Sequence, residues 1–167
     1  MTQIAVPDTW TPGPTTGTVR PGPGCATCDR FEVISPRPHA EITSPDAAAR
    51  VLVPAFDGAD RERCVAALLD TKHRLRAMVT VSVGSIDHTF MAPREVLRDA
   101  LLANAAAVVL AHNHPSGDPS PSRDDEAVTR RLMRAGELVG VEVLDHLVIG
   151  ADRWVSLARR GVATDNG

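Results

Sequence analysis

Two histidines, His112 and His114, stand one residue apart between an apolar run and a loop rich in Pro, Ser and Asp. Side chains alternate along a β-strand, so both imidazoles are expected on one face, within reach of one metal ion. Asp125 lies in the first turn of the helix expected to follow, where its carboxylate can turn toward the same point. Two ring nitrogens and one carboxylate oxygen make three ligands, and zinc sites with three protein ligands keep a fourth position open for water. The spacing therefore favours a catalytic metal ion over a structural one.

A catalytic zinc ion would supply a hydroxide nucleophile, because it brings the pKa of its bound water to about 7. Such a site also needs a general base and a donor for the developing oxyanion. Glu62 is the candidate base and Ser122 the candidate donor, although spacing alone assigns neither role. Simpler interpretations exist for Glu62 and for Asp125. A glutamate in the stretch DRERC is usually a solvated surface charge, and Asp125, three residues after Ser122, fits the pattern of a helix capping box.

Neighbouring polar residues are less suited to this chemistry. His146 follows Asp145, but adjacent strand residues face opposite ways, so we expect a hydrogen-bonded structural histidine rather than half of a catalytic dyad. Asn113, between the two histidines, is expected to point away from the metal. The contiguous letters H-N-H do not indicate an HNH nuclease, whose residues are spread over a longer ββα unit. The remaining histidines are expected at the surface: His39, His73 and His88.

The chain contains three cysteines, Cys25, Cys28 and Cys64, an odd number that suits a reducing compartment better than a disulfide framework. Cys25 and Cys28 form a C-x-x-C pair, which is half of a four-ligand zinc site. His39 and Cys64 are the nearby residues able to complete it. The alternative, which we favour, is a solvent-facing pair in a loose tail.

A strand and a helix must hold the proposed ligands. Residues 107–114, AVVLAHNH, are typical of a strand buried on both faces that runs straight into the histidines. Residues 122–140 are typical of an amphipathic helix that ends at Gly140. Its inner stripe is expected to consist of Val128, Leu132, Ala135 and Val139.

Further elements surround these two. Ser44 and Pro45 are typical of a helix start, and the short helix is expected to end at Pro54. Apolar periodicity predicts three more elements: an antiparallel hairpin over 64–70 and 75–84, a helix over 92–105 and a strand over 141–150. Strands and helices alternate, so the fold class is α/β or α+β, with a mixed sheet flanked by helices.

At 167 residues, the chain has room for one domain with a core and an additional tail. Residues 1–40 are rich in Pro, Gly and Thr, which predicts a disordered tail, and residues 41–167 are expected to form the domain. The formal charge is -3 and the sequence pI is near 6.0, so no overall basic field attracts nucleic acid. The sequence contains neither a signal-peptide pattern nor a membrane-spanning run, so a soluble cytoplasmic protein without a membrane partner is expected.

The string HNHPSG, followed by PS and then by an aspartate, resembles the JAMM (MPN+) metalloprotease motif. More narrowly, the chain resembles the RadC family of bacterial JAMM-domain proteins over about residues 44–161. Four stretches each resemble a RadC block, in the same order: RERCVAALLDTKHRL, APREVLRDALLANAAAVVLAHNHPSG, PSRDDEAVTRRL and VLDHLVIG. Ordered blocks of this length make the resemblance highly specific.

This resemblance implies a cytidine-deaminase-like α/β sandwich, in which a mixed curved sheet is flanked by helices. It implies that His112, His114 and Asp125 are the zinc ligands. It makes Glu62 the general base and Ser122 the residue that helps to stabilise the tetrahedral intermediate. The expected function is that of a zinc-dependent hydrolase of peptide or isopeptide bonds, which acts on a peptide or protein substrate.

Two other functions remain open at this point. One is a non-enzymatic RadC-like module that binds DNA or a protein partner and holds a structural or vestigial metal. RadC proteins commonly carry an N-terminal helix-hairpin-helix region, and this chain has Pro-rich residues there, so the resemblance alone does not support a DNA role. Deaminase chemistry is suggested by the related fold, but it is disfavoured because the P-C-x-x-C ligand pair is missing after the histidines.

Overall fold

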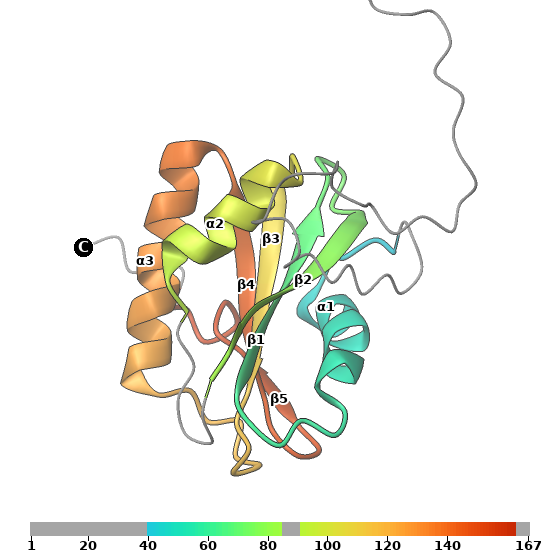
Figure 1. Cartoon of the computed structure of the whole chain (residues 1–167), viewed down its shortest axis with the longest axis vertical. Coiled ribbons are helices and arrows are strands. Elements are labelled where there is room, and N and C mark those ends of the chain that lie inside the picture. Colours follow the sequence, from blue (N-terminus) through green and yellow to red (C-terminus); the bar gives the residue numbers. More distant parts are fainter. Residues whose placement is uncertain (1–39, 85–90, 163–167) are drawn as a thin grey trace, which may run out of the picture.

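The computed structural model describes residues 40–84 and 91–162, which fold around one five-stranded sheet. The strands in chain order are β1 (Arg63–Leu69), β2 (Leu75–Val83), β3 (Ala107–Asn113), β4 (Glu142–Ile149) and β5 (Trp154–Ser156). In space they lie in the order β2-β1-β3-β4-β5. On one face the sheet is covered by α2 (Pro93–Leu102) and α3 (Arg123–Val139), and on the other by α1 (Pro45–Leu52) (Figure 1). The predicted α/β class with a mixed sheet flanked by helices is confirmed.

The sheet is mixed because its strands are connected in two ways. β1 and β2 form the predicted antiparallel hairpin, and β1 also pairs antiparallel with β3. β3 and β4 are parallel, because α3 carries the chain from the end of β3 back to the start of β4. β5 completes the sheet antiparallel to β4. The C-terminal end of β3 and the N-terminus of α3 therefore lie at the same end of the sheet (Figure 1).

β3 is the central strand and is buried over its whole length. Its even-numbered residues, such as Val108 and Leu110, face a core shared with α2 and α3. Its odd-numbered residues, such as Val109 and Ala111, face a second core shared with α1. The prediction of a strand buried on both faces is confirmed. His112 continues the even-numbered series, so the alternation of the strand sends its imidazole toward α3.

The first helix begins where the sequence predicts. Ser44 caps α1 by accepting a backbone hydrogen bond at 3.2 Å, and Pro45 takes the first helical position. A short 3-10 helix, η2 (Val53–Phe56), follows at once and contains Pro54. The predicted end of α1 at Pro54 is therefore correct to within two residues.

The last turn of α3 differs from its predicted inner stripe. Three of the four predicted residues pack against the core as expected: Val128, Leu132 and Ala135. Val139 is instead 45% exposed, so this part of the prediction is wrong. The chain reverses at Gly140, whose φ is 73°, and Val141 packs beneath the turn against Gly136. Val141, just after the turn, is thus buried in the core that packs against α3, whereas Val139 is not.

Some predictions fall on residues outside the described ranges. They concern the tail, the C-x-x-C pair and two of the histidines expected at the surface: residues 1–39, Cys25, Cys28, His39 and His88. Cys64 is a free thiol, fully buried in the core beneath α2 and α3. His73 is half-buried in the turn between β1 and β2. Within 40–84 and 91–162, no helix is both long enough and apolar enough to cross a bilayer.

Candidate metal centre

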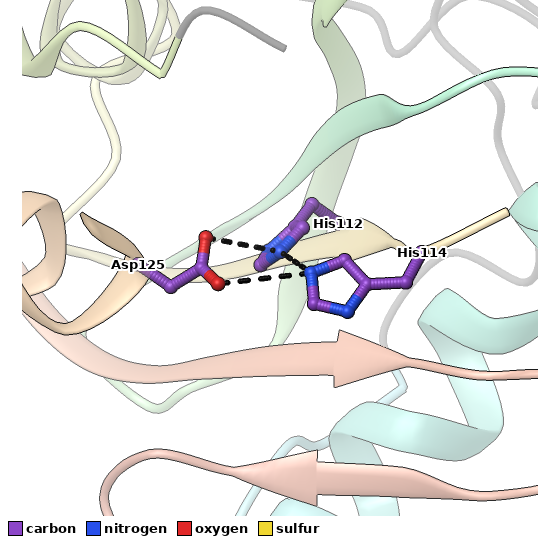
Figure 2. Close-up of side chains that lie close together, drawn as sticks. All are labelled: His112, His114 and Asp125. Carbon is purple, nitrogen blue, oxygen red and sulfur yellow. Dashed lines mark hydrogen bonds and ion pairs between the residues drawn. The ribbon is translucent and has the colours of Figure 1, made fainter. Parts of the chain in front are cut away.

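The end of β3 and the first turn of α3 bring together His112, His114 and Asp125 (Figure 2). The two histidine Nε2 atoms lie 3.0 Å apart. His112 Nε2 is 3.2 Å from Oδ1 of Asp125, and His114 Nε2 is 3.6 Å from Oδ2. One ligand atom from each of the three residues lies within 4.8 Å of the others. The fold therefore places two imidazoles and a carboxylate around one point.

Both imidazoles are held through their Nδ1 atoms. His114 Nδ1 lies 2.8 Å from the backbone carbonyl oxygen of Asp118. A carbonyl oxygen only accepts, so this Nδ1 carries a proton, and the lone pair of the neutral ring is on Nε2. His112 Nδ1 lies 2.8 Å from Nε2 of His146. In both ligand histidines, the remaining nitrogen is the one that faces Asp125.

Asp125 is oriented by the start of its own helix. Its Oδ2 accepts hydrogen bonds from the backbone N–H of Ser122 at 2.7 Å and from the Ser122 hydroxyl at 2.6 Å. The backbone N–H of Asp125 donates to that hydroxyl oxygen at 3.1 Å, which completes the predicted capping box. Both of the bonds to the carboxylate engage Oδ2, and Oδ1 faces His112. The capping interpretation and the ligand interpretation of Asp125 therefore describe one arrangement.

The charges of the centre favour a cation. Burial opposes ionisation of Asp125, but its contacts with His112 and His114 outweigh burial and hold the pKa of that carboxyl well below its usual range. The hydrogen bond with Asp125 in turn raises the pKa of the His114 imidazole above its ordinary value. The site thus attracts positive charge, whether protons or a metal ion carry it.

The donor set fits a divalent transition-metal ion. Two imidazole nitrogens and one carboxylate oxygen form a ligand set used by catalytic zinc sites. In a tetrahedral zinc site, two nitrogens at about 2.0 Å from the ion lie about 3.3 Å apart. The two Nε2 atoms are 3.0 Å apart here. Nitrogen lone pairs and a charged carboxylate repel one another at such distances unless a cation lies among them.

Glu62 lies beside this centre and is buried, with only 6% of its surface exposed. It directly precedes β1, in which Cys64 pairs with His112. Continuing this antiparallel register by two residues sets Glu62 opposite His114, on the same face of the sheet. In addition to the hydrogen bond with Asp125, the negative charge of Glu62 contributes to the raised pKa of His114. The interpretation of Glu62 as a solvated surface charge is therefore wrong, and its role as a base stays a prediction.

His146 lies behind His112, as the hydrogen-bonded structural histidine that the sequence predicts. It is fully buried, and it bonds through Nε2 with His112 and through Nδ1 with the Thr129 hydroxyl at 2.6 Å. Burial lowers the pKa of His146 well below its ordinary value. The sequence pattern did not single out Thr129. Its only local signal is its position four residues after Asp125, on the same side of the helix.

Asp145 faces the opposite side of β4 from His146. Its carboxylate accepts hydrogen bonds from the backbone N–H groups of His146 at 2.7 Å and Ala158 at 3.0 Å, and from the Ser156 hydroxyl at 2.7 Å. A register shift in the pairing of β3 with β4 lies just before this point. Only the histidine of the Asp145–His146 pair therefore reaches the metal centre, as expected from strand alternation.

Other polar residues near the motif have structural positions. Asn113 points away from the two imidazoles, as expected, and bonds to the chain leading into β1. Asp118 supplies its carbonyl oxygen to His114, while its carboxylate accepts from the Ser120 hydroxyl at 2.8 Å. Asp124 is exposed in the first turn of α3, where a negative charge stabilises the helix N-terminus.

The chain is similar to known proteins over most of its described part. A family model described as a RadC-like JAB domain matches residues 42–162. The chain is 40% identical over 132 residues to a UPF0758 protein of Methanosarcina mazei, covering 79% of this chain and 58% of that protein. It is 48% identical over 126 residues to a UPF0758 protein of Syntrophotalea carbinolica, covering 75% and 56% of the two chains. It is 46% identical over 121 residues to a UPF0758 protein of Moorella thermoacetica, covering 72% and 53%. The chain thus spans little more than half the length of these curated relatives.

Proposed function

The chain belongs to the RadC-like JAB domain family, and from this membership and the metal centre we propose that it is a zinc-dependent hydrolase of peptide or isopeptide bonds. One observation carries the proposal: two imidazole nitrogens and a carboxylate oxygen lie within 4.8 Å of one another at the end of a buried strand. Three protein ligands are the number found in zinc sites that act on a substrate. A structural site would close the fourth position with another side chain.

His112, His114 and Asp125 would hold the ion. Zinc bound there would polarise the scissile carbonyl group and lower the pKa of a water molecule at the open position to about 7. The contribution of the chain is to fix the geometry. The end of β3 and the residue after it bring both rings to Asp125 (Figure 2), and the capping box orients the carboxylate. Such preorganisation lowers the barrier by orienting the reacting groups in advance.

Glu62 is the proposed general base. Its carboxylate would take a proton from the attacking water and later pass it to the leaving amine. A base must lie within hydrogen-bond reach of the proton that it abstracts. The burial of Glu62 and its place opposite His114 in the strand register support this role.

Ser122 is the proposed donor to the developing oxyanion. Its hydroxyl and its backbone N–H both donate to Oδ2 of Asp125, at 2.6 Å and 2.7 Å. The backbone bond does not involve the hydroxyl, so it would remain if the hydroxyl rotated toward the tetrahedral intermediate. An additional donor to the oxyanion typically contributes about 100- to 1000-fold in turnover.

The proposed substrate is a peptide or protein chain, and the proposed location is the cytoplasm, where Cys64 would stay reduced. A net charge of -3 provides no overall attraction for nucleic acid. Titration of a labelled DNA duplex at low salt therefore tests the alternative of a DNA-binding module. Tight, strongly salt-dependent binding would favour that alternative.

Two variants test the proposed function. The purified protein should contain about one zinc ion per chain, and His114→Ala should lose it. Glu62→Gln should keep the zinc and lose hydrolysis of a panel of peptide and isopeptide substrates. Full activity in Glu62→Gln would show that the base is wrongly assigned, and a zinc-free purified protein that also takes up none on dialysis would remove the basis of the proposal.

A further inference from the structure

A chain of buried hydrogen bonds runs behind the metal centre, from α3 through β4 to β3. The hydroxyl oxygen of Thr129 lies 2.6 Å from the backbone carbonyl oxygen of Asp125 and 2.6 Å from Nδ1 of His146. Nε2 of His146 lies 2.8 Å from Nδ1 of His112. Thr129, His146 and His112 each have 0% of their surface exposed. Bulk water therefore does not compete for these bonds.

The donor and acceptor in each of these hydrogen bonds can be assigned in turn, starting from the carbonyl oxygen of Asp125. The carbonyl oxygen of Asp125 can only accept, so the single hydroxyl proton of Thr129 points at it. The Thr129 oxygen is then an acceptor toward His146, whose Nδ1 must carry a proton. A neutral imidazole has one donor and one acceptor nitrogen, so a proton on Nδ1 of His146 leaves its Nε2 as a bare acceptor. His112 Nδ1 must donate to this acceptor.

We propose that Thr129 and His146 are positioning residues that set the tautomer of His112, so that its Nε2 presents a lone pair to the metal ion. The inference rests on the metal site of the proposed function, but not on the reaction. Without these two residues, the ring of His112 would be free to carry its proton on Nε2, where it would block the ligand atom. Removing a residue that hydrogen-bonds to a metal ligand typically lowers metal affinity by about 10- to 100-fold.

The two ligand histidines are fixed in different ways. His114 donates to a backbone carbonyl, that of Asp118, which no side-chain substitution removes. His112 depends on two side chains contributed by a helix and a neighbouring strand. Substitution of Thr129 therefore alters the tautomer control of one ligand and leaves that of the other intact.

Thr129→Val is the informative variant, because valine has nearly the shape of threonine and lacks the hydroxyl. Zinc affinity, measured by competition with a chelator of known affinity, should fall about 10- to 100-fold. Thr129→Ser keeps the hydroxyl and should bind zinc nearly as tightly as the unsubstituted protein. Thr80→Val makes the same change on β2, which β1 separates from β3, and serves as the matched control. Equal zinc affinity in Thr129→Val and the unsubstituted protein would overturn the inference.

Nitrogen-15 NMR of the zinc-free protein reads the tautomer without any metal. At a pH above the titration of the imidazoles, His112 should carry its proton on Nδ1, and Thr129→Val should shift it toward Nε2. A His112 that is protonated on Nε2 in the unsubstituted protein would contradict the inference, even if zinc binds. If the protein binds no zinc, the proposed function fails, whereas Nδ1 protonation of His112 that depends on Thr129 would still support the tautomer control.

Discussion

The side-chain oxygen Oδ1 of Asn113 accepts a hydrogen bond from the backbone N–H of Arg63 at 2.8 Å. The same amide donates through Nδ2 to the carbonyl oxygen of Arg61 at 3.2 Å. Backbone pairing of β1 with β3 ends at Cys64 and His112, so this side chain extends the ladder beyond the last backbone pair. The residue between its two partners is Glu62.

Asn113 therefore connects the proposed base with the proposed ligands, because it stands between the two histidines of the metal centre. On the other edge of β1, the backbone N–H of Gly84 donates to the carbonyl oxygen of Glu62 at 2.8 Å. The main chain around Glu62 is thus hydrogen-bonded on both sides. We expect the distance between Glu62 and the metal centre to depend on Asn113.

Asn113→Ala should lower turnover without removing zinc. Two backbone groups lose their partner, which should lower the free energy of unfolding by about 1–3 kcal/mol. Glu62 loses its fixed position, so kcat should fall while KM changes little. Kinetics on a substrate whose hydrolysis requires Glu62, together with zinc analysis, measure the two effects. Asn113→Asp keeps the acceptor for Arg63, so its kcat should lie between those of Asn113→Ala and the unsubstituted protein. Loss of zinc in Asn113→Ala would show instead that the amide supports the metal ligands.

Gly150→Ala should weaken both the fold and zinc binding. An added Cβ would lie 2.4 Å from the carbonyl oxygen of Gly117 and 2.8 Å from Cδ of Pro119, so the loop must move. That loop carries the Asp118 carbonyl that holds His114. Overpacking of this kind typically costs about 1–3 kcal/mol, and zinc affinity should fall about tenfold.

Gly58→Ala is the comparison for Gly150→Ala. Gly58 has a φ of +68° and no atom within 4 Å of the added Cβ, so only the backbone conformation is penalised, by about 1–2 kcal/mol. Thermal unfolding and chelator competition on both variants separate a general loss of stability from a loss at the metal centre. Unchanged zinc affinity in Gly150→Ala would mean that the loop does not control His114.

Zinc should stabilise the protein more strongly as the pH rises. In the zinc-free protein, Asp125 raises the pKa of His114, so this pair contributes stability below the unfolded-state pKa of about 6.5. That contribution is lost as the pH rises through the higher folded-state pKa. Zinc requires the deprotonated ring and therefore gains affinity over the same range. The difference in Tm between zinc-loaded and zinc-free protein, measured by calorimetry, should grow from about pH 6 to about pH 8, and a difference that shrinks would contradict this account.

Gly136→Ala should destabilise the protein even though alanine favours helices. Replacing a helical glycine by alanine normally stabilises by about 1 kcal/mol. Here the added Cβ would lie 2.4 Å from the carbonyl oxygen of Val141, which is backbone and cannot rotate away. We expect a net loss of about 1–3 kcal/mol in chemical denaturation. Leu138→Ala, at a position that is 88% exposed on the same helix, should change stability by less than about 0.5 kcal/mol.

The sequence predicted the parts of the site that depend on local geometry. Strand alternation placed His112 and His114 on one face, and the capping pattern placed Asp125 in the first turn of α3. The buried central strand and the hairpin were equally predictable, because their apolar patterns are continuous. These features need only a few neighbouring residues.

Features that depend on distant contacts were not predictable in this way. Glu62 lies where the end of β1 meets the end of β3, and these ends are joined by the hydrogen bond between Arg63 and Asn113, which are 50 residues apart. The bond between Thr129 and His146 joins residues 17 positions apart on different elements. The chain turns back after α3, so that Val141 lies close to Gly136 and is buried while Val139 is exposed. Helical periodicity does not predict this turn.

Anomalous X-ray scattering at the zinc absorption edge, on crystals of the zinc-loaded protein, tests the metal centre most directly. We predict one peak at about 2.0–2.2 Å from Nε2 of His112, Nε2 of His114 and a carboxylate oxygen of Asp125, with water at the remaining position. A crystal without this peak, or a fourth protein atom bound to the ion, would contradict the hydrolase assignment.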